Sequence, residues 1–404
     1  MIAEAEYPVS KGEIYQPKDP VDFRRTLALY CCFFDVTFYG IREKILWEHP
    51  ISASKCRRLA GEEEDNGRIV CADVLSITIS GVDFDYIQKF YEWDRMEIGT
   101  LRRYRKGRLP REFVLSILKL YEKKTALKGV EGMERDYQAS KEMINSAYGN
   151  IIMDVCRKEY LYEGSAWEDV EALDFTKKEE LIRKYNESPG RFIFYPWGCI
   201  VTALCRRRLL NAIAAVGVDY VYSDTDSIKF LHPDRYKEYF DRENEEIREK
   251  TRLALFSLHI PQEMAAPKNK KGEEKPIGVF EFEGVYDRFK TLGAKRYAFE
   301  KDGNFSITVS GVNKFTAAPY LINKYRDRVF DAFSDDLEIP KGAAGKMTHT
   351  YIDDEMVGEA ADYLGNRFRY YEKSGVHLEE AAYSLSIAEK YMRYLLKIKE
   401  RKLY

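Results

Sequence analysis

Two largely apolar stretches near the start of the chain predict β-strands. Residues 27–41 and 69–80 are rich in aromatic and β-branched side chains, which favour strands with a buried face. Residues 1–25 are polar and interrupted by proline, so we expect an irregular segment there. Residues 83–93 place apolar side chains at helical spacing, with Asp83 as the expected N-cap.

Longer apolar repeats at helical spacing predict helices in the middle of the chain. Pro110 opens one amphipathic stretch, which ends near Gly129, and a second runs from about residue 134 to 147. These two helices should form an antiparallel pair that carries many Lys and Arg residues. A further helix is expected over residues 201–216, with Gly217 as its C-cap.

The remaining segments differ in composition. Residues 150–195 are polar and mixed, which indicates an insertion. Residues 233–256 predict a charged helix, and residues 265–275 predict a loop. Residues 277–309 predict strands separated by glycine turns, whereas residues 311–404 predict a mixture of loops and helices with an amphipathic end.

Composition narrows the class of protein without identifying it. A chain of 404 residues can form several structural units with cores of their own. The net charge of -2 does not indicate a nucleic-acid-binding protein, but basic clusters at residues 102–108 and 206–208 are either phosphate contacts or solvated faces. The seven cysteines include no C-x-x-C pair, so we expect reduced thiols and not a disulfide or zinc framework. No apolar run reaches transmembrane length, so no membrane partner is expected.

A pair of acids stands in the sequence Y-S-D-T-D-S at residues 222–227. Alternating apolar residues flank it on both sides, so the acids should lie at a strand–turn–strand junction. Carboxylates this close repel each other and favour a cation such as Mg²⁺, which takes hard oxygen ligands. Two such ions about 4 Å apart can hold the attacking and leaving oxygens of a phosphoryl transfer. The alternative is an exposed polar turn without a ligand.

A second motif lies at the end of the second predicted helix of the pair. Lys141, Asn145 and Tyr148 are spaced i, i+4 and i+7, so one helix face presents all three. A cation, an amide and an aromatic ring on one face could contact a triphosphate, a sugar and a base. The alternative is an exposed amphipathic helix.

Together the motifs occur in the order and spacing of one enzyme family. K-x3-N-S-x-Y-G at residues 141–149 precedes Y-x-D-T-D-S at residues 222–227, and a basic-aromatic K-x-Y element follows at residues 295–297. This set resembles the family B DNA polymerases, and the similarity extends over nearly all of the chain. The chain is most similar to the polymerases of tailed bacteriophages and to the protein-primed branch of the family.

The resemblance implies an α+β fold with the right-hand architecture of a polymerase. Such an enzyme has an antiparallel palm sheet, fingers built as a helical hairpin, and a thumb of mixed structure. An insertion linked to strand displacement and processivity occurs in the protein-primed branch. The corresponding boundaries are residues 1–105 for the first part of the palm, 106–149 for the fingers, 150–195 for the insertion, 196–310 for the palm with the acidic hairpin and K-x-Y element, and 311–404 for the thumb.

The resemblance also implies template-directed DNA synthesis, with primer–template DNA and dNTPs as partners. Asp226 would be the principal Mg²⁺ ligand, and Asp224 would lie beside it in a two-ion catalytic site. Lys295 and Tyr297 would hold the primer terminus, together with Thr225 at the tip of the acidic turn.

The nucleotide site is implied on the pair of helices. Lys141 would bind the incoming triphosphate, and Lys124 would join it, with Lys123 as an equally good candidate on the same helix. The residues implied for the sugar pocket are Tyr148, which would help to exclude ribose, Asn145 and Gly149.

One motif of the family is absent from the sequence. Family members carry D-x2-S-L-Y-P upstream of the fingers, and its Asp bridges both metal ions. Residues 34–40 contain Asp35 but lack the Ser and the Pro, and in a strand Asp35 would share a solvated face with Thr37 and Tyr39. Residues 1–8 resemble the segment that follows the missing motif. We therefore expect the C-terminal portion of a polymerase, without the exonuclease domain and the first catalytic Asp.

Three hypotheses follow. The chain is a polymerase whose two-ion site is completed by an Asp from an upstream half that carries the exonuclease domain, with a terminal protein as a further candidate partner. The alternatives are a non-catalytic nucleic-acid-binding remnant and a metal-dependent phosphotransferase that uses only Asp224 and Asp226. An upstream reading frame that ends in the missing motif would favour the first. A cytoplasmic location is expected, in the host cell if the chain is phage-encoded.

Overall fold

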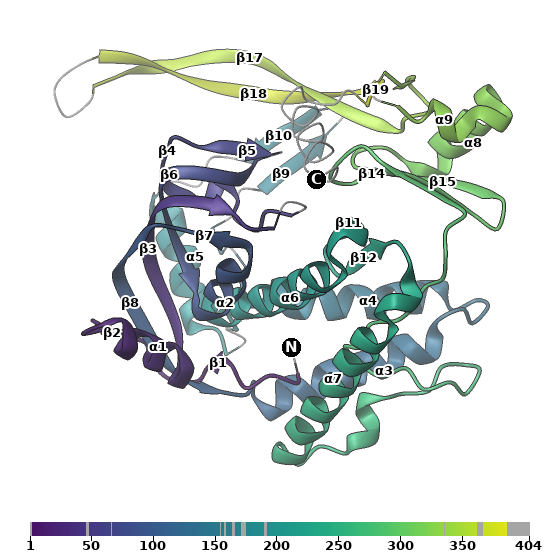
Figure 1. The fold of residues 1–404 in the computed structure, drawn as a ribbon. Helices are drawn as coiled ribbons and strands as arrows, with labels where there is room; N and C mark the ends of the chain where they lie inside the picture. Colours follow the sequence, from purple (N-terminus) through teal and green to yellow (C-terminus); the bar gives the residue numbers. More distant parts are fainter. Residues whose placement is uncertain are drawn as a thin grey trace. The chain divides into compact units, whose positions relative to one another are not determined.

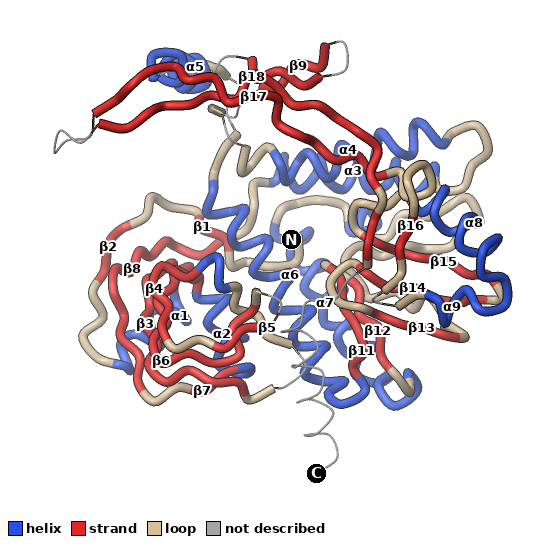
Figure 2. Tube along the Cα trace, turned by 90° about the horizontal axis from the view of Figure 1, so that it is seen from above, coloured by secondary structure: helices blue, strands red, loops and turns tan. Residues whose placement is uncertain are grey.

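The computed structural model describes residues 2–385 apart from gaps at 46–47, 66, 154, 157–158, 164–165, 171–174, 190–191, 335 and 362–366. The described chain divides into two compact units. Residues 2–153 and 192–282 form the first unit, and residues 155–189 and 283–385 belong to the second. Both units combine helices with antiparallel strands (Figure 2).

The first unit is built on an eight-stranded antiparallel sheet (Figure 1). Its strands are β1 (Tyr7–Pro8), β2 (Glu13–Tyr15), β3 (Tyr30–Glu43), β4 (Cys56–Ala60), β5 (Glu63–Asp65), β6 (Arg68–Ser80), β7 (Tyr91–Glu92) and β8 (Arg95–Gly107). The main path has the order β1–β8–β3–β6–β4, while β2 pairs with β8, β5 with β6 and β7 with β3. The two predicted strands are confirmed as β3 and β6, whereas β8 was not predicted.

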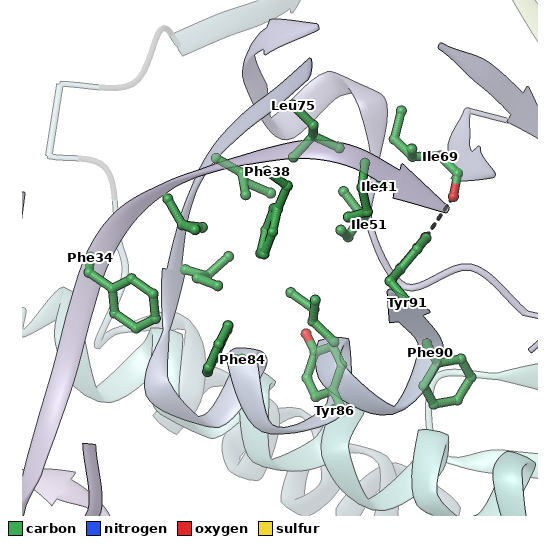
Figure 3. Close-up of a cluster of buried hydrophobic side chains, with 14 of the residues drawn as sticks. Phe34, Phe38, Ile41, Ile51, Ile69, Leu75, Phe84, Tyr86, Phe90 and Tyr91 are labelled. Atoms are coloured by element: carbon green, nitrogen blue, oxygen red, sulfur yellow. Dashed lines mark hydrogen bonds between the residues drawn. The ribbon is translucent and has the colours of Figure 1, made fainter. Parts of the chain in front are cut away.

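The buried face of this sheet holds the largest core of the unit (Figure 3). Phe34 and Phe38 of β3 are almost fully buried, as the alternation in the sequence predicts. They face the helix α2 (Gly81–Phe90), from which Phe84 packs edge-on against Phe34 at 5.7 Å between ring centroids. Each such side chain contributes about 1.5–3 kcal/mol of burial free energy.

The opposite face of β3 is polar. Asp35 accepts a hydrogen bond from Thr78 at 2.5 Å, Thr37 bonds Ser76 at 2.8 Å, and Tyr39 donates to Glu97 at 2.9 Å. The expectation that Asp35, Thr37 and Tyr39 share a solvated face is therefore confirmed.

Two local expectations for the N-terminal part are wrong. Residues 20–29 form the helix α1 (Pro20–Leu29) within what we expected to be an irregular segment and the start of a strand. Asp19 caps α1 by accepting from two backbone N–H groups, and Pro20 takes a first-turn position, where its missing N–H costs nothing. Asp83 does not cap α2; Ser80 does, and Asp83 is the reciprocal acid of a capping box.

The expected antiparallel pair of helices is confirmed as α3 (Arg111–Leu127) and α4 (Glu134–Gly149). The connecting turn contains Gly129 and Gly132, both with positive φ angles of 71° and 77°. The helix α6 (Tyr195–Val216) begins before the predicted residue 201, and Gly217 is its C-cap with a φ of 56°, as predicted. The charged helix is confirmed as α7 (Lys237–Ser257).

The second unit contains a three-stranded antiparallel sheet of β13 (Arg288–Thr291), β14 (Arg296–Lys301) and β15 (Asn304–Val309). Ala298 and Ile307 on one face are fully buried against a core that includes residues of α8 (Lys314–Tyr325) and α9 (Val329–Ala332). Two short strands, β16 (Glu338–Ile339) and β19 (Tyr383–Ser384), pair with each other.

A long hairpin dominates the rest of the second unit. Its strands are β17 (Lys346–Ala361) and β18 (Arg367–Ala381), where we had expected loops and helices. β18 also pairs with β10 (Ala166–Val170), which pairs with β9 (Glu159–Glu163), and α5 (Phe175–Glu187) follows in the chain. The 150–195 segment thus adds its strands to the edge of a sheet formed by residues near 350–380. The expected C-terminal amphipathic helix lies outside the described residues. None of the described helices is both long and apolar enough to cross a membrane.

Candidate active site

The acid pair lies at the tip of a hairpin, as predicted. β11 (Tyr220–Asp224) and β12 (Ser227–Phe230) are antiparallel, and Asp224 lies opposite Ser227. The turn is tight, because the Asp226 N–H donates to the Asp224 carbonyl at 2.7 Å across Thr225. The hairpin forms a two-stranded sheet of its own and is not part of the eight-stranded sheet.

Thr225 has a φ of 56°, which is unusual for a β-branched residue. A backbone held in such a region costs about 1–3 kcal/mol and persists only where the surroundings impose it. Asn or Gly at this position would relieve the strain. Its hydroxyl donates to the Asp224 carboxylate at 2.9 Å, which gives the side chain a function in the turn.

The two carboxylates offer hard oxygen ligands to solvent. Asp226 is exposed and Asp224 is partly exposed, while the Ser227 hydroxyl donates to the Asp224 carbonyl at 3.2 Å. These groups fit one side of a Mg²⁺ site, since Mg²⁺ normally takes one or two carboxylates and completes its shell with waters and phosphates. Among the described residues, no group of three or more His, Cys, Asp or Glu side chains could hold a metal ion.

Asp219 fixes the base of the hairpin. Its backbone carbonyl accepts from the Leu231 N–H at 2.8 Å, which closes the two strands. Its carboxylate accepts from the Tyr236 hydroxyl at 2.8 Å and lies 3.1 Å from Nδ1 of His232. The Tyr236 hydrogen bond, more than the His232 charge, lowers the pKa of Asp219. This role of Asp219 could not be predicted, because nothing in the sequence distinguishes it from any other polar residue before a strand.

A partly buried acid, Glu48, supports the hairpin from the other side. The Tyr220 hydroxyl donates to Glu48 at 3.0 Å and lies 2.9 Å from the Ser223 hydroxyl, next to Asp224. Burial raises the pKa of Glu48, and the Tyr220 hydrogen bond opposes that shift. Asp65 lies in the same environment, where burial raises its pKa to about 6.

Glu48→Gln is expected to stabilise the protein at alkaline pH and to change little at acid pH. The folded-state pKa of Glu48 lies above its ordinary value of 4.5, so its contribution to stability is fully present below that pH and is lost as pH rises through the folded-state pKa. A neutral amide that still accepts from Tyr220 avoids this loss. The variant should gain on the order of 1 kcal/mol at alkaline pH, which is the usual size of a single-substitution effect. Chemical denaturation of both proteins between acid and alkaline pH measures the difference.

Tyr220→Phe is the control for this experiment, because it removes the side-chain hydrogen bond that opposes the rise in the pKa of Glu48. That variant should be less stable than the wild type, most of all at alkaline pH. An equal effect of Glu48→Gln at both ends of the pH range would contradict the account.

Asp35 does not face the hairpin. Tyr220 and Ile228 of the hairpin pack against the core on the buried face of the eight-stranded sheet, and Asp35 lies on the opposite face of β3. Arg57 also approaches the Asp35 carboxylate at 3.2 Å, so its charge is balanced locally. Asp35 therefore cannot supply the missing ligand in this structure.

The nucleotide-site residues predicted on α4 differ in exposure. Lys141, Asn145 and Gly149 are exposed, and a Cβ at Gly149 would meet nothing within 4 Å. Tyr148 is partly buried and packs in the core that α6 forms with α3. Burial raises the pKa of Tyr148, and a hydrogen bond with Thr202 of α6 opposes the shift. Because the acidic hairpin follows α6 and packs on it, α6 carries contacts to both candidate elements.

The two candidate lysines on α3 are not equivalent. Lys124 is partly buried, whereas Lys123 is exposed. Burial lowers the pKa of Lys124, and the charges of Lys128 and Lys141 lower it further. Lys124 thus belongs to a cluster of cations that also includes Lys128, at the end of α3, and Lys141 of α4.

The basic cluster at residues 206–208 has internal partners. Arg206 donates to Asp83 at 2.8 Å and to the Tyr86 hydroxyl at 3.0 Å, which ties α6 to α2. Arg207 lies 3.7 Å from Glu4, and Arg208 donates to the carbonyl of Gly278. In the 102–108 cluster, Arg103 pairs with Glu13 and lies over the Tyr15 ring, while Arg102 and Arg105 are exposed.

The K-x-Y element lies in the second unit. Lys295 is exposed and has a φ of 54°, at the turn that leads into β14. Tyr297 stacks on Phe289 with 5.4 Å between ring centroids and an interplanar angle of 28°. It also stacks on Phe299, so the ring belongs to an aromatic row on the face of the sheet opposite the buried Ala298.

Comparison with known proteins shows a DNA polymerase-like fold. No protein-family model and no curated protein sequence matches the chain. Solved structures of Phi29 DNA polymerase are similar to it. The complex with primer-template DNA and incoming nucleotide substrates has a TM-score of 0.55 and 16% sequence identity, over 95% of this chain and 56% of that one. The post-translocation complex with primer-template DNA has a TM-score of 0.52 and 17% identity, over 94% and 54% of the two chains.

This chain therefore spans little more than half the length of the polymerase that it matches. The similarity confirms, at the level of the fold, the resemblance seen in the motifs. A mixed α+β chain with antiparallel sheets is what the motifs implied. The division into palm, fingers and thumb, and the roles of single residues, stay predictions.

Proposed function

We propose that this chain is the part of a DNA-directed DNA polymerase that carries the acidic hairpin, the finger helices and the K-x-Y element. The observation that carries the proposal is the strained hairpin tip, which presents Asp224 and Asp226 to solvent within a fold similar to that of a DNA polymerase. The reaction is the transfer of a deoxynucleotide from a dNTP to the 3′ end of a primer on a DNA template.

The proposal gives roles in this reaction to the residues of the hairpin and of the α3–α4 pair. Asp226 and Asp224 would hold Mg²⁺, which when bound stabilises the charge that develops on the attacking and leaving oxygens. Lys141 and Lys124 would bind the triphosphate as point charges, and the partly buried Tyr148 would form a wall of the sugar pocket. Thr225 orients Asp224 through its hydroxyl, in addition to any contact with the primer.

A second candidate function is a nucleic-acid-binding module without activity of its own. It is favoured by one observation, the lack of a third ligand residue beside the hairpin within the described parts of the chain. An upstream polypeptide that supplies the D-x2-S-L-Y-P motif separates the two functions, because it restores activity only if the hairpin is catalytic.

Binding of primed DNA is expected to weaken steeply as salt rises. Because phosphate contacts release counterions, about four contacts would lower the affinity on the order of 100-fold between roughly 50 and 200 mM salt. Fluorescence anisotropy with a labelled primer–template measures the slope. Lys295→Gln should reduce that slope by about one phosphate contact. Lys341→Gln, an exposed lysine of the same unit, serves as the control and should not change it. An affinity that does not depend on salt would contradict the proposal.

A further inference from the structure

The segment that follows α7, residues 259–282, is named the strap here. One end of the strap lies against the pair of α3 and α4, the proposed finger helices. Tyr121 of α3 donates to the carbonyl of Lys275 at 3.2 Å, and Lys270 donates to the carbonyl of Gly129 in the finger turn. The strap is therefore tied to the fingers at two separate points, one on a helix and one on the turn between the helices.

The strap is fixed more firmly at its other end. Asn244 of α7 bonds both backbone groups of Phe280, donating to its carbonyl at 2.9 Å and accepting from its N–H at 2.6 Å. Arg208 of α6 donates to the carbonyl of Gly278, and its guanidinium lies 4.4 Å from the centroid of the Phe280 ring. These contacts set the backbone position of the next residue, Glu281.

The side chain of Glu281 turns back toward the finger helix. Its carboxylate lies 2.8 Å from Nζ of Lys275, the residue whose carbonyl accepts from Tyr121. Nζ of Lys124 lies 5.2 Å from the centroid of the same Tyr121 ring. Through these contacts, the Glu281 carboxylate lies near the face of α3 that carries Lys124.

The charges agree with this geometry. The pKa of Glu281 is lowered first by its hydrogen bond from Lys275. The positive charges of Lys275, Lys128 and Lys124 lower it further. In return Glu281 opposes the fall that burial and the neighbouring lysines cause in the pKa of Lys124. Glu281 thus offsets part of the mutual repulsion of Lys124 and Lys128 at the end of α3.

We propose that Glu281 is a built-in anion of Lys124 and Lys128 at the end of α3 and that it competes with the polyphosphate group of a nucleotide for these lysines. This inference rests on the proposed function, which assigns Lys124 and Lys141 to the triphosphate. The Glu281 side chain is 63% exposed, so it can leave the lysines for water when a polyphosphate arrives. Its effect is on the affinity of the site and not on the chemical step.

Equilibrium binding of inorganic tripolyphosphate and of dATP, each with Mg²⁺, tests the competition by calorimetry. Glu281→Gln should bind both ligands roughly two- to fivefold more tightly at low salt, which is the range of an exposed ion pair. The gain should shrink as salt rises, because exposed charges are screened. Glu273→Gln is the matched control, because the Glu273 carboxylate also lies 3.7 Å from Nζ of Lys275. Its pKa is lowered by a hydrogen bond with Asn269 and next by the charges of Lys275 and Lys271, and not by the lysines of α3 or α4. An unchanged or weaker affinity of Glu281→Gln overturns the inference.

A second measurement separates this inference from the proposed function. In a double-mutant cycle of unfolding at low salt, Glu281→Gln and Lys124→Gln should be non-additive, because the two charges interact in the folded protein without any ligand. Additive effects overturn the inference. Non-additive effects, with no tripolyphosphate or dATP bound by any variant, would overturn the proposed nucleotide site and the competition with it.

Discussion

Asp226→Asn is expected to abolish nucleotide incorporation and to leave the fold intact. The Asp226 carboxylate is exposed, and the hydrogen bond that closes the turn uses its backbone N–H, so the amide costs no contact within the described structure. The stability should change by no more than about 0.5 kcal/mol, as is usual for exposed positions. The reaction, in contrast, loses a charged ligand where negative charge develops. A loss of about 4 kcal/mol or more of transition-state stabilisation lowers the rate of incorporation by a factor of about a thousand or more, at roughly 1.36 kcal/mol per factor of ten.

Primer extension measures this effect, with the chain supplied together with the polypeptide that carries the D-x2-S-L-Y-P motif. Asp234→Asn is the matched control, because Asp234 is an exposed aspartate that follows the hairpin by a few residues. It should extend primers at the wild-type rate. If Asp226→Asn retained the wild-type rate, the hairpin could not be the metal-binding element, and the polymerase proposal would fail.

The features that the sequence predicts well are those determined by neighbouring residues. The alternation in β3 places Phe34 and Phe38 in the core and Asp35 on the other face, and the structure agrees. The α3–α4 pair and the acidic hairpin likewise follow from short-range signals, namely helical spacing, glycine turns and two strand-like flanks around polar residues.

The elements that were missed depend on partners far away in the chain. The sequence of β8 contains the basic cluster at residues 102–108 and gives no clear strand signal. Only its pairing with β3 shows that it is a strand inside the sheet. β17 and β18 pair with each other over many residues, which compensates for a composition that also suits helices and loops. α1 is the exception, since Asp19 followed by Pro20 is a local helix-start signal that the polar composition obscured.

The same distinction applies to the candidate site. The acids of the hairpin and the candidate residues of α4 are adjacent or helically spaced, so their motifs can be recognised in the sequence. The residues that hold them come from elsewhere: Glu48 contacts Tyr220 across 172 positions of the chain, and Arg206 contacts Asp83 across 123. Such pairs can be identified only once the sheet and α6 are placed against each other.

Incorporation by the chain alone is expected to stay at background. Two-metal chemistry needs carboxylates that converge on the ion pair from more than one element, and the hairpin supplies only one side of that cage. Within the described residues no third ligand residue joins Asp224 and Asp226. The nearest candidate from the sequence, Asp35, is bonded to Thr78 and approached by Arg57 on the far face of the sheet.

Primer extension by the purified chain, with and without the D-x2-S-L-Y-P polypeptide, tests this expectation. The chain alone should incorporate nothing above a no-protein control, and the mixture should extend the primer. Asp35→Ala should not alter the extension rate of the mixture, whereas Asp226→Asn should abolish extension, because the proposed function assigns the metal ions to the hairpin and not to Asp35. Robust incorporation by the chain alone that is lost in Asp35→Ala would show that β3 rearranges to bring Asp35 to the metal ions. A mixture that binds primed DNA with a steep salt dependence yet never extends it would leave the chain as a nucleic-acid-binding module.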